Sequence, residues 1–228
     1  MCSVPAVPQG VLDADRGSHA EQRWHEFAFP LFPEPSGDRR LLDVGCGGGG
    51  VMRWAAARGW NVTGIDVSPQ NVEAMRRMRF AAEVVDLNGD LPFREASFDC
   101  VVFIEVAEHL VRAEHAFHEI SRVVAPGGSV VFTTPNNASY RRRLKALKGR
   151  APDDEGYHFR FWVKGELERK WEDAGLRVTA AASYGFLPVF DMLTFHKART
   201  GKRRIFPIPR RWESLFADRF VWRLTKPA

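Results

Sequence analysis

The sequence has few cysteines, no long apolar run and, at residues 1–10, no pattern typical of an export leader. Its three cysteines, Cys2, Cys46 and Cys100, are an odd number without a CxxC pair, which disfavours a disulfide framework and favours a reducing compartment. No stretch approaches the roughly 18 consecutive apolar residues that cross a bilayer, and residues 1–10 lack a basic segment followed by an apolar one. We therefore expect a cytoplasmic protein in which Cys100 is a small buried hydrophobe.

The composition predicts a globular protein with one core. Hydrophobic residues make up 45% and charged residues 27% of the 228 positions, which excludes wholesale disorder and a fibrous repeat. The net charge of +5 is unevenly distributed. Residues 197–228 carry ten basic and two acidic side chains, a net charge of +8, whereas residues 1–196 carry 23 basic and 26 acidic ones, a net charge of −3. The basic character therefore belongs to the C-terminal segment and does not describe the core.

Short apolar runs alternate with segments of helical length from Arg40 onward. This alternation is typical of βαβ units, in which helices cover both faces of a mostly parallel sheet. Ser68 followed by Pro69 predicts a helix start, and Gly127 is placed where a helix should end. We expect a doubly wound α/β fold with strands over residues 41–45, 61–66, 82–86, 98–106, 129–134 and 177–182, and helices over residues 20–29, 51–59, 69–80, 112–124 and 164–174.

The most informative segment is an apolar strand that runs into a glycine-rich loop and then a helix, at residues 41–50. Glycines let a ligand approach the backbone and permit positive φ angles in a tight turn. The N-terminus of the following helix offers unpaired amides to an anion. Gly45, Gly47 and Gly50 also satisfy the GxGxxG pattern of dinucleotide-binding proteins. A nicotinamide- or flavin-dependent enzyme is therefore one alternative.

Three aspartates distinguish between the alternatives. Asp43 lies in the strand that enters the glycine loop, where its charge would repel a pyrophosphate and attract a cationic amine. Asp66 ends the second strand, 21 residues after Gly45, the position from which a carboxylate accepts both ribose hydroxyls. Asp86 ends the third strand, where it can accept from an adenine amino group. Because ligands of open α/β sheets collect at the carboxyl ends of strands, these acids together predict an adenosine that carries an amino acid.

Five motifs in order resemble those of the class I S-adenosylmethionine-dependent methyltransferases: DVGCGGG, GIDVS, VVDLNGDLPF, SFDCVVFIEVAEHL and VAPGGSVVFTTPN. The resemblance covers about residues 41–182. It implies S-adenosylmethionine as the cofactor and a seven-stranded, mostly parallel sheet whose last strand, residues 220–224, is antiparallel. By the same resemblance Asp43 and the loop amides hold the methionine part, Asp66 the ribose, and Asp86 with the Leu87 amide the adenine. The implied cofactor-binding residues are Asp43, Gly45, Cys46, Gly47, Gly49, Asp66, Val67, Asp86, Leu87 and Glu105.

Candidate catalytic residues follow the fourth strand, where the acceptor of a methyl group would lie. Glu105, Glu108 and His109 are grouped there, and His158 precedes a predicted helix from which it can face them. We expect His109 or His158 to act as the general base that removes a proton from the acceptor. The same four residues resemble the divalent-metal set of the small-RNA 2′-O-methyltransferases and the ubiquinone-pathway O-methyltransferases. Metal-free relatives carry a similar EVxEH string and a later HxRF, so a divalent metal is an open alternative that we do not expect.

The class of acceptor is only partly indicated. No [DNS]PP[YFW] motif follows the fourth strand, which disfavours methylation of amino groups on DNA and favours an oxygen acceptor. We expect a small-molecule acceptor, or one linked to a lipid or a carrier, and no nucleic acid. One alternative to such an enzyme is a non-catalytic S-adenosylmethionine-binding or membrane-associated protein. The other is the nicotinamide-dependent oxidoreductase.

The ends of the chain flank the predicted core at residues 39–183. Residues 1–38 are expected to form an N-terminal segment with a lid-like helix. Residues 184–228 mix aromatic with basic side chains, and we expect a helix over residues 189–197, a proline-stiffened stretch, another short helix and the last strand. This C-terminal segment is predicted to be a lid over the acceptor. Peripheral contact with an anionic membrane is the first alternative and nucleic-acid binding the second.

Overall fold

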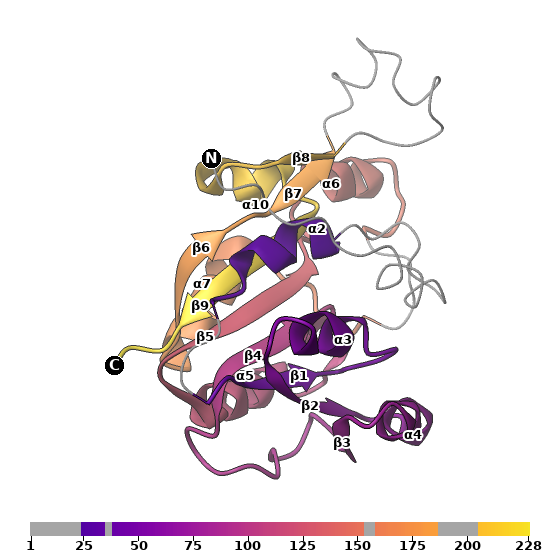
Figure 1. Cartoon of the computed structure of the whole chain (residues 1–228). Coiled ribbons are helices and arrows are strands. Elements are labelled where there is room, and N and C mark those ends of the chain that lie inside the picture. The colour runs from indigo at the N-terminus through magenta and orange to yellow at the C-terminus, as the bar shows by residue number, and fades with distance from the viewer. Residues whose placement is uncertain (1–23, 35–37, 153–157, 187–204) are drawn as a thin grey trace.

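The computed structural model describes residues 24–34, 38–152, 158–186 and 205–228, and it is organised around one mixed sheet (Figure 1). Within these ranges the sheet has nine strands. In chain order they are β1 (Arg40–Val44), β2 (Asn61–Asp66), β3 (Ala81–Val84), β4 (Phe98–Ile104), β5 (Val124–Pro135), β6 (Arg177–Ala181), β7 (Tyr184–Phe186), β8 (Ile205–Pro207) and β9 (Arg219–Thr225).

The strand order is β3-β2-β1-β4-β5-β9-β7-β8, with β6 paired to β9. Strands β1 to β5 pair in parallel, whereas β9 is antiparallel to β5 and to β6. The predicted α/β class and the antiparallel last strand are therefore confirmed. The order of the sheet reverses between β1 and β4, and the carboxyl ends of strands at such a switch point are where α/β proteins bind ligands.

Helices cover both faces of the sheet, as the alternation in the sequence predicts. One face is covered by α2 (Trp24–Ala28), η1 (Phe29–Leu31), α3 (Gly50–Ala56) and α4 (Pro69–Arg77), and the other by α5 (Ala113–Val123) and α7 (Lys164–Asp173). The remaining helical segments are η2 (Ala107–His109), α6 (Tyr140–Leu147), η3 (Arg210–Trp212) and α10 (Glu213–Phe216). In the part of the chain that the structure describes, no helix has the length and apolar character needed to span a membrane.

The two layers of core follow the alternation of side chains along the strands. In β4, Val101 and Phe103 pack on the side of α5 and α7, while Cys100 and Val102 pack on the opposite side. All four side chains are fully buried, and residues 100–104 of this strand accordingly form an uninterrupted apolar run. Burial also raises the pKa of the Cys100 thiol. The prediction that Cys100 is a buried hydrophobe is confirmed.

Three details differ from the predicted strands. The sheet has nine strands rather than seven, because β7 and β8 pair with each other beside β9. Strand β3 ends at Val84 rather than at Asp86, since its partner β2 ends at Asp66, opposite Val84. Strand β5 begins at Val124 rather than at Ser129, because Val124 pairs with Phe98 of β4 ahead of an irregularity in the register. Gly127 therefore lies inside this strand and not at the end of a helix.

Both flanking segments contact the body of the domain. The helix predicted over residues 20–29 is seen as α2 and η1 in the described range, where the Phe27 ring stacks on Tyr184 with centroids 4.4 Å apart and the Phe29 ring stacks on Trp54 at 4.1 Å. The short helix predicted near the C-terminus is α10. The helix predicted over residues 189–197 lies outside the described residues.

Asn136, directly after β5, anchors the segment that precedes β9. Its Nδ2 donates to the carbonyl oxygens of Glu213, Ser214 and Ala217, at 3.0, 3.3 and 2.8 Å. Its Oδ1 accepts from the amide of Ala138 at 2.9 Å. The side chain is fully buried, so water cannot replace these hydrogen bonds.

We expect Asn136→Ala to lower the free energy of unfolding by about 2–4 kcal/mol, because it leaves several buried backbone groups without partners. Chemical denaturation measures this change. Asn61→Ala, at an exposed position at the start of β2, is the matched control and should change stability by no more than about 0.5 kcal/mol. Equal losses in the two variants would contradict the anchoring role.

Candidate functional site

The glycine loop joins β1 to α3 at the carboxyl end of the sheet. The amides of Gly45 and Cys46 both donate to the carbonyl oxygen of Ile65, at 2.8 and 3.0 Å, and this fixes the loop against the end of β2. Gly45 has a φ of 78°, and a Cβ at this residue would lie 2.5 Å from Cγ2 of Val106. The missing side chain therefore lets the loop after β1 pack directly on the residues that follow β4.

The backbone at Gly47 faces open space. Its φ is 46°, and among the described residues no atom lies within 4 Å of the position that a Cβ would take. Its amide donates to Oδ2 of Asp66 at 2.9 Å. Gly49, with a φ of 71°, is the N-cap of α3. Backbone atoms at Gly47 are thus accessible to a ligand that a larger residue would exclude.

Two of the predicted acids are buried beside this loop. Asp43 is 4% and Asp66 8% exposed. The Asp66 carboxylate links two loops, because Oδ1 accepts from the amide of Ser68 at 2.8 Å while Oδ2 accepts from Gly47. Each oxygen keeps a second lone pair for a further donor. Burial, together with the charges of Asp43 and Asp66, raises the pKa of the Cys46 thiol to about 12, so this thiol stays neutral.

The third acid, Asp86, lies in an exposed turn after β3. Its Oδ1 accepts from both the backbone amide and Nδ2 of Asn88, each at 2.9 Å, and these hydrogen bonds hold the pKa of Asp86 below its usual value. Leu87 is buried beneath the turn. Val67, which follows Asp66, exposes 66% of its surface. The end of β2 and the turn after β3 thus present one apolar and one acidic side chain to solvent.

The tip of β4 has an unusual conformation at Glu105. Its φ of 54° lies in the left-handed region, which is uncommon for a residue with a side chain. The Glu105 amide donates to the Thr133 carbonyl at 3.1 Å, and Oε1 accepts from the Thr133 hydroxyl at 2.7 Å. Oε2 pairs with Nη1 of Arg219, the first residue of β9. Strands β5 and β9 therefore both hold Glu105.

Glu108, in η2, is the most deeply buried acid of the site, with 1% of its surface exposed. Its Oε2 accepts from the hydroxyl of Thr134 at 3.0 Å. Burial and the nearby charge of Glu105 raise the pKa of Glu108 to about 8. At neutral pH the carboxyl group is therefore largely protonated and uncharged.

The backbone of Glu108 brings a distant segment to the site. Its carbonyl oxygen accepts from the amides of Phe159 and Arg160, at 2.8 and 3.1 Å. The amide of Asn137 donates to the carbonyl of Trp162 at 2.9 Å, so the chain between β5 and α7 leaves the sheet and returns at one place. These contacts place the residue before Phe159, which is His158, beside η2.

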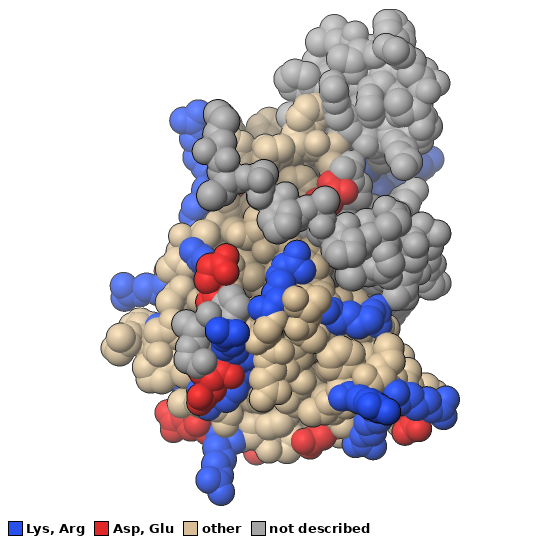
Figure 2. Space-filling view, viewed as in Figure 1, with Lys and Arg blue, Asp and Glu red and all other residues tan. Residues whose placement is uncertain are grey.

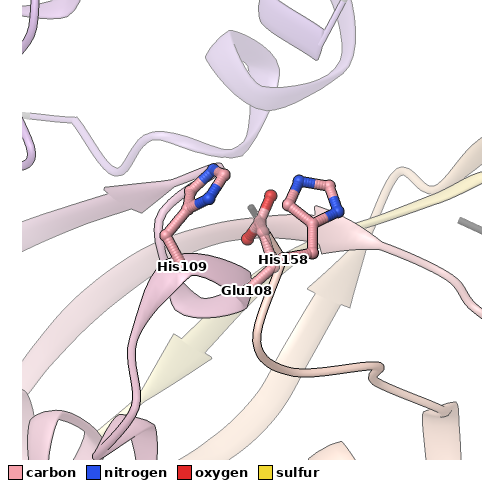
Figure 3. A group of neighbouring side chains, drawn as sticks. All are labelled: Glu108, His109 and His158. Carbon is pink, nitrogen blue, oxygen red and sulfur yellow. The ribbon is translucent and has the colours of Figure 1, made fainter. Parts of the chain in front are cut away.

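The side chains of His109 and His158 lie next to each other and next to the carboxyl group of Glu108 (Figure 3). The two imidazole rings have centroids 4.8 Å apart, and one ligand atom from each of the three residues lies within 4.8 Å of the others. The predicted approach of His158 to the residues after β4 is confirmed. Of the four candidate metal ligands, three form this group, while Glu105 is engaged by Thr133 and Arg219.

Three residues that hold the acids of the site, Arg219, Thr133 and Thr134, were not predicted from the sequence. The two threonines fix Glu105 and Glu108, and their position at the end of a predicted strand beside the site was a usable signal. Arg219 is separated from Glu105 by 114 residues. Its contact depends on the antiparallel register of β9, in which Arg219 lies opposite Pro135. Nothing local to residue 219 indicates this partner.

Comparison with known proteins places these features among methyltransferases. A family model described as a methyltransferase domain matches residues 16–181. The chain is 38% identical to a ubiquinone biosynthesis O-methyltransferase of Alkalilimnicola ehrlichii over 104 residues, which are 43% of this chain and 42% of that protein. It is 31% identical to a ubiquinone biosynthesis O-methyltransferase of Chromobacterium violaceum over 166 residues, 66% of this chain and 70% of that protein.

Two further proteins are similar to this chain, one a sequence relative with a different name and the other a solved structure. A 27-O-demethylrifamycin SV methyltransferase of Amycolatopsis mediterranei is 37% identical over 110 residues, 45% of this chain and 40% of that protein. Among solved structures, an S-adenosylmethionine-dependent methyltransferase from Mesorhizobium loti aligns with a TM-score of 0.62 over 87% of this chain and 95% of that one, at 19% identity. The structural similarity concerns the fold.

We expect Gly47→Ala to fold but to weaken binding of S-adenosylhomocysteine by about tenfold or more, since the added Cβ would occupy the open space beside the loop. Isothermal titration measures the dissociation constant. Gly149→Ala is the matched control, because Gly149 also has a positive φ, 68°, and no neighbour within 4 Å among the described residues. If both variants bind like the wild type, the space beside Gly47 is not a ligand site.

We expect the stability of the wild type, relative to Glu108→Gln, to fall as the pH rises from about 5 to 8. The folded protein holds the Glu108 proton up to a pKa of about 8, whereas the unfolded chain releases it near 4.3. Between these values the folded state binds more protons, so its stability decreases with pH. Urea denaturation at several pH values tests this, with Glu83→Gln, at an exposed position in β3, as the control. A difference that is independent of pH would contradict the raised pKa.

Proposed function

Because the chain belongs to the methyltransferase domain family and is an S-adenosylmethionine-dependent methyltransferase, we propose that it methylates a hydroxyl oxygen of a small organic acceptor. The proposal rests chiefly on the group formed by Glu108, His109 and His158, at the tip of the strand beside the glycine loop. The names of the relatives support an oxygen acceptor, since two of them specify O-methylation and the third a 27-O-demethyl compound.

We propose that the cofactor occupies the carboxyl ends of β1, β2 and β3. Asp43 and the loop at Gly45, Cys46, Gly47 and Gly49 would hold the methionine part, since a buried carboxylate attracts its ammonium group and the backbone at Gly47 is open.

The nucleoside part is assigned to the neighbouring strand ends. Asp66 keeps lone pairs for the ribose hydroxyls, Val67 offers an exposed apolar surface to the adenine ring, and Asp86 with the Leu87 amide is placed to bind its edge. Glu105 would close the site at the methionine end, next to β4. These roles are the ones that the resemblance of the sequence motifs implies.

In the proposed mechanism the protein orients the acceptor and removes its proton. When bound, S-adenosylmethionine supplies a methyl group on a positively charged sulfur, which is already an activated donor. Orientation of two reactants contributes roughly 7–11 kcal/mol to such a displacement. His109 or His158 would accept the hydroxyl proton of the acceptor. The acceptor oxygen could then take the methyl group that the cofactor would supply, while the sulfur would keep the electrons of the broken S–C bond and become neutral. The carboxyl group of Glu108 lies beside both rings and can hydrogen-bond to either.

We propose that the reaction does not require a metal ion. The ligand types of Glu108, His109 and His158 suit a divalent cation, which would lower the pKa of the acceptor hydroxyl if it were bound there. Glu105, the fourth candidate ligand, is however already paired with Arg219 and hydrogen-bonded to Thr133, which leaves three protein ligands in the group. The histidines can perform the proton transfer by themselves.

The core is residues 39–183, and residues 184–228 add the last strand, β9, to the same domain. Residues 1–38 and the part of residues 184–228 that precedes β9 are proposed to enclose the acceptor. The partner is proposed to be a small molecule, either free or linked to a lipid or carrier. If the acceptor is linked to a lipid, residues 184–228 are proposed to make peripheral contact with the membrane. On the face shown in Figure 2, basic and acidic side chains are interspersed, which does not favour nucleic-acid binding through that face. A cytoplasmic location agrees with the reduced, free Cys46 and Cys100.

We expect His109→Ala and His158→Ala to reduce turnover of a phenolic acceptor, and one of the two to reduce it by about 10²–10⁴-fold, the contribution typical of a general base. Binding of S-adenosylhomocysteine should stay unchanged, since neither histidine is assigned to the cofactor. Transfer of a radiolabelled methyl group measures turnover. His118→Ala, on the exposed face of α5, is the matched control. Full turnover in both histidine variants would refute the proposed base.

The same assay separates the remaining alternatives. We expect a chelator such as EDTA to leave turnover intact, and loss of activity that added Mg²⁺ restores would show that the three-residue group holds a metal. We also expect calorimetric binding of S-adenosylhomocysteine and none of NADH, because Asp43 would repel a pyrophosphate. Binding of S-adenosylhomocysteine without transfer to any acceptor would indicate a non-catalytic binding protein.

A further inference from the structure

The ion pair of Glu105 and Arg219 joins the tip of β4 to the start of the last strand. Both side chains are nearly buried, with 12% and 14% of their side-chain surfaces exposed. The pair is one part of a longer arrangement, because Thr133 donates to the other carboxylate oxygen of Glu105 at 2.7 Å. Glu105 is therefore held from two neighbouring strands, and its carboxylate cannot turn without breaking a charged contact.

The conformation of Glu105 shows that this restraint acts on the backbone. A φ of 54° is strained for a glutamate, and such strain persists only where surrounding contacts impose it. Glu105 is also the link between β4 and η2. The residue after it, Val106, packs against Gly45 of the glycine loop, and the carbonyl of Val106 accepts from the amide of His109 at 2.9 Å. The backbone at Glu105 thus sets the position of both the loop contact and the histidine.

Arg219 is itself fixed by its strand and by an aromatic residue. In the sheet it lies opposite Pro135 on one side and Tyr184 on the other. Burial raises the pKa of the Tyr184 hydroxyl, while the charge of Arg219 and its hydrogen bond to that hydroxyl act in the opposite direction. The ring of Phe27 stacks on Tyr184. The guanidinium is therefore a rigid support with few alternative positions.

We propose that Arg219 is a positioning residue for the methyl-transfer site: through its ion pair it holds Glu105, and with it the tip of β4, in the conformation that cofactor binding requires. The inference rests on the proposed function, because it assigns Arg219 to the same site. It also gives the last strand a role in cofactor binding, although this strand is far along the chain from the glycine loop and from Glu105. An ion pair that served folding alone would leave cofactor affinity unaffected once folding was restored.

The test compares binding of S-adenosylhomocysteine by the full chain in five variants. We expect Arg219→Met and Glu105→Gln each to raise the dissociation constant about tenfold or more, the scale of losing a hydrogen bond to a charged group. Arg219→Lys should raise the dissociation constant by a smaller factor, because lysine keeps the positive charge. Arg223→Met is the matched control: Arg223 lies on the same strand and face, and the wild-type dissociation constant is expected.

The double variant Glu105→Gln/Arg219→Met distinguishes positioning from folding. Each single variant leaves a nearly buried charge unpaired and is expected to unfold at a lower temperature, whereas the double variant has neither charge and should recover most of the melting temperature. We expect its binding to stay as weak as that of the weaker single variant. Wild-type binding by the double variant, or by a folded Arg219→Met protein, overturns the inference and leaves the proposed function intact. Absence of binding by the wild type would overturn both.

Discussion

The close contact between the ends of β1 and β4 is the constraint on which the rest of the site depends. Gly45 has no side chain, so Val106 fills the space above it and the two strand ends lie against each other. The hydrogen bonds from Gly45 and Cys46 to Ile65 fix the same loop to β2. As a result, the groups proposed for the cofactor and those proposed for the acceptor emerge from one edge of the sheet.

Most of the fold could be predicted because its signals are local. The start of α4 is an example: Ser68 accepts from the amide of Asn71 at 3.3 Å, and Pro69 follows in the first helical position. Strands buried on both faces were recognisable as apolar runs of strand length. The strands β7 and β8 were not predictable, since each has three residues and neither repeats a pattern. Their pairing depends on contacts far apart in the chain.

The candidate site likewise has a part that could be predicted from the sequence and a part that could not. Asp43, Asp66 and the glycines are encoded next to the strands that position them, so their proximity followed from the parallel sheet. The proximity of His109 and His158 was predicted from their places before and after the predicted elements. The structure explains it by two hydrogen bonds, from the amides of Phe159 and Arg160 to the carbonyl oxygen of Glu108. The uncharged state of Glu108 was not predictable, because it results from tertiary burial and the neighbouring Glu105.

The hydrogen bond between Asn137 and Trp162 closes the excursion that connects β5 to α7. His158, inside this excursion, is held separately, because the amides of Phe159 and Arg160 donate to the carbonyl of Glu108. Near the other end of the excursion, the Tyr140 hydroxyl donates to the carbonyl of Phe186 at 2.7 Å and Arg141 pairs with Asp218. The place of this histidine is therefore set by hydrogen bonds one or two residues away from it, and not by the length of chain that leads up to it from β5.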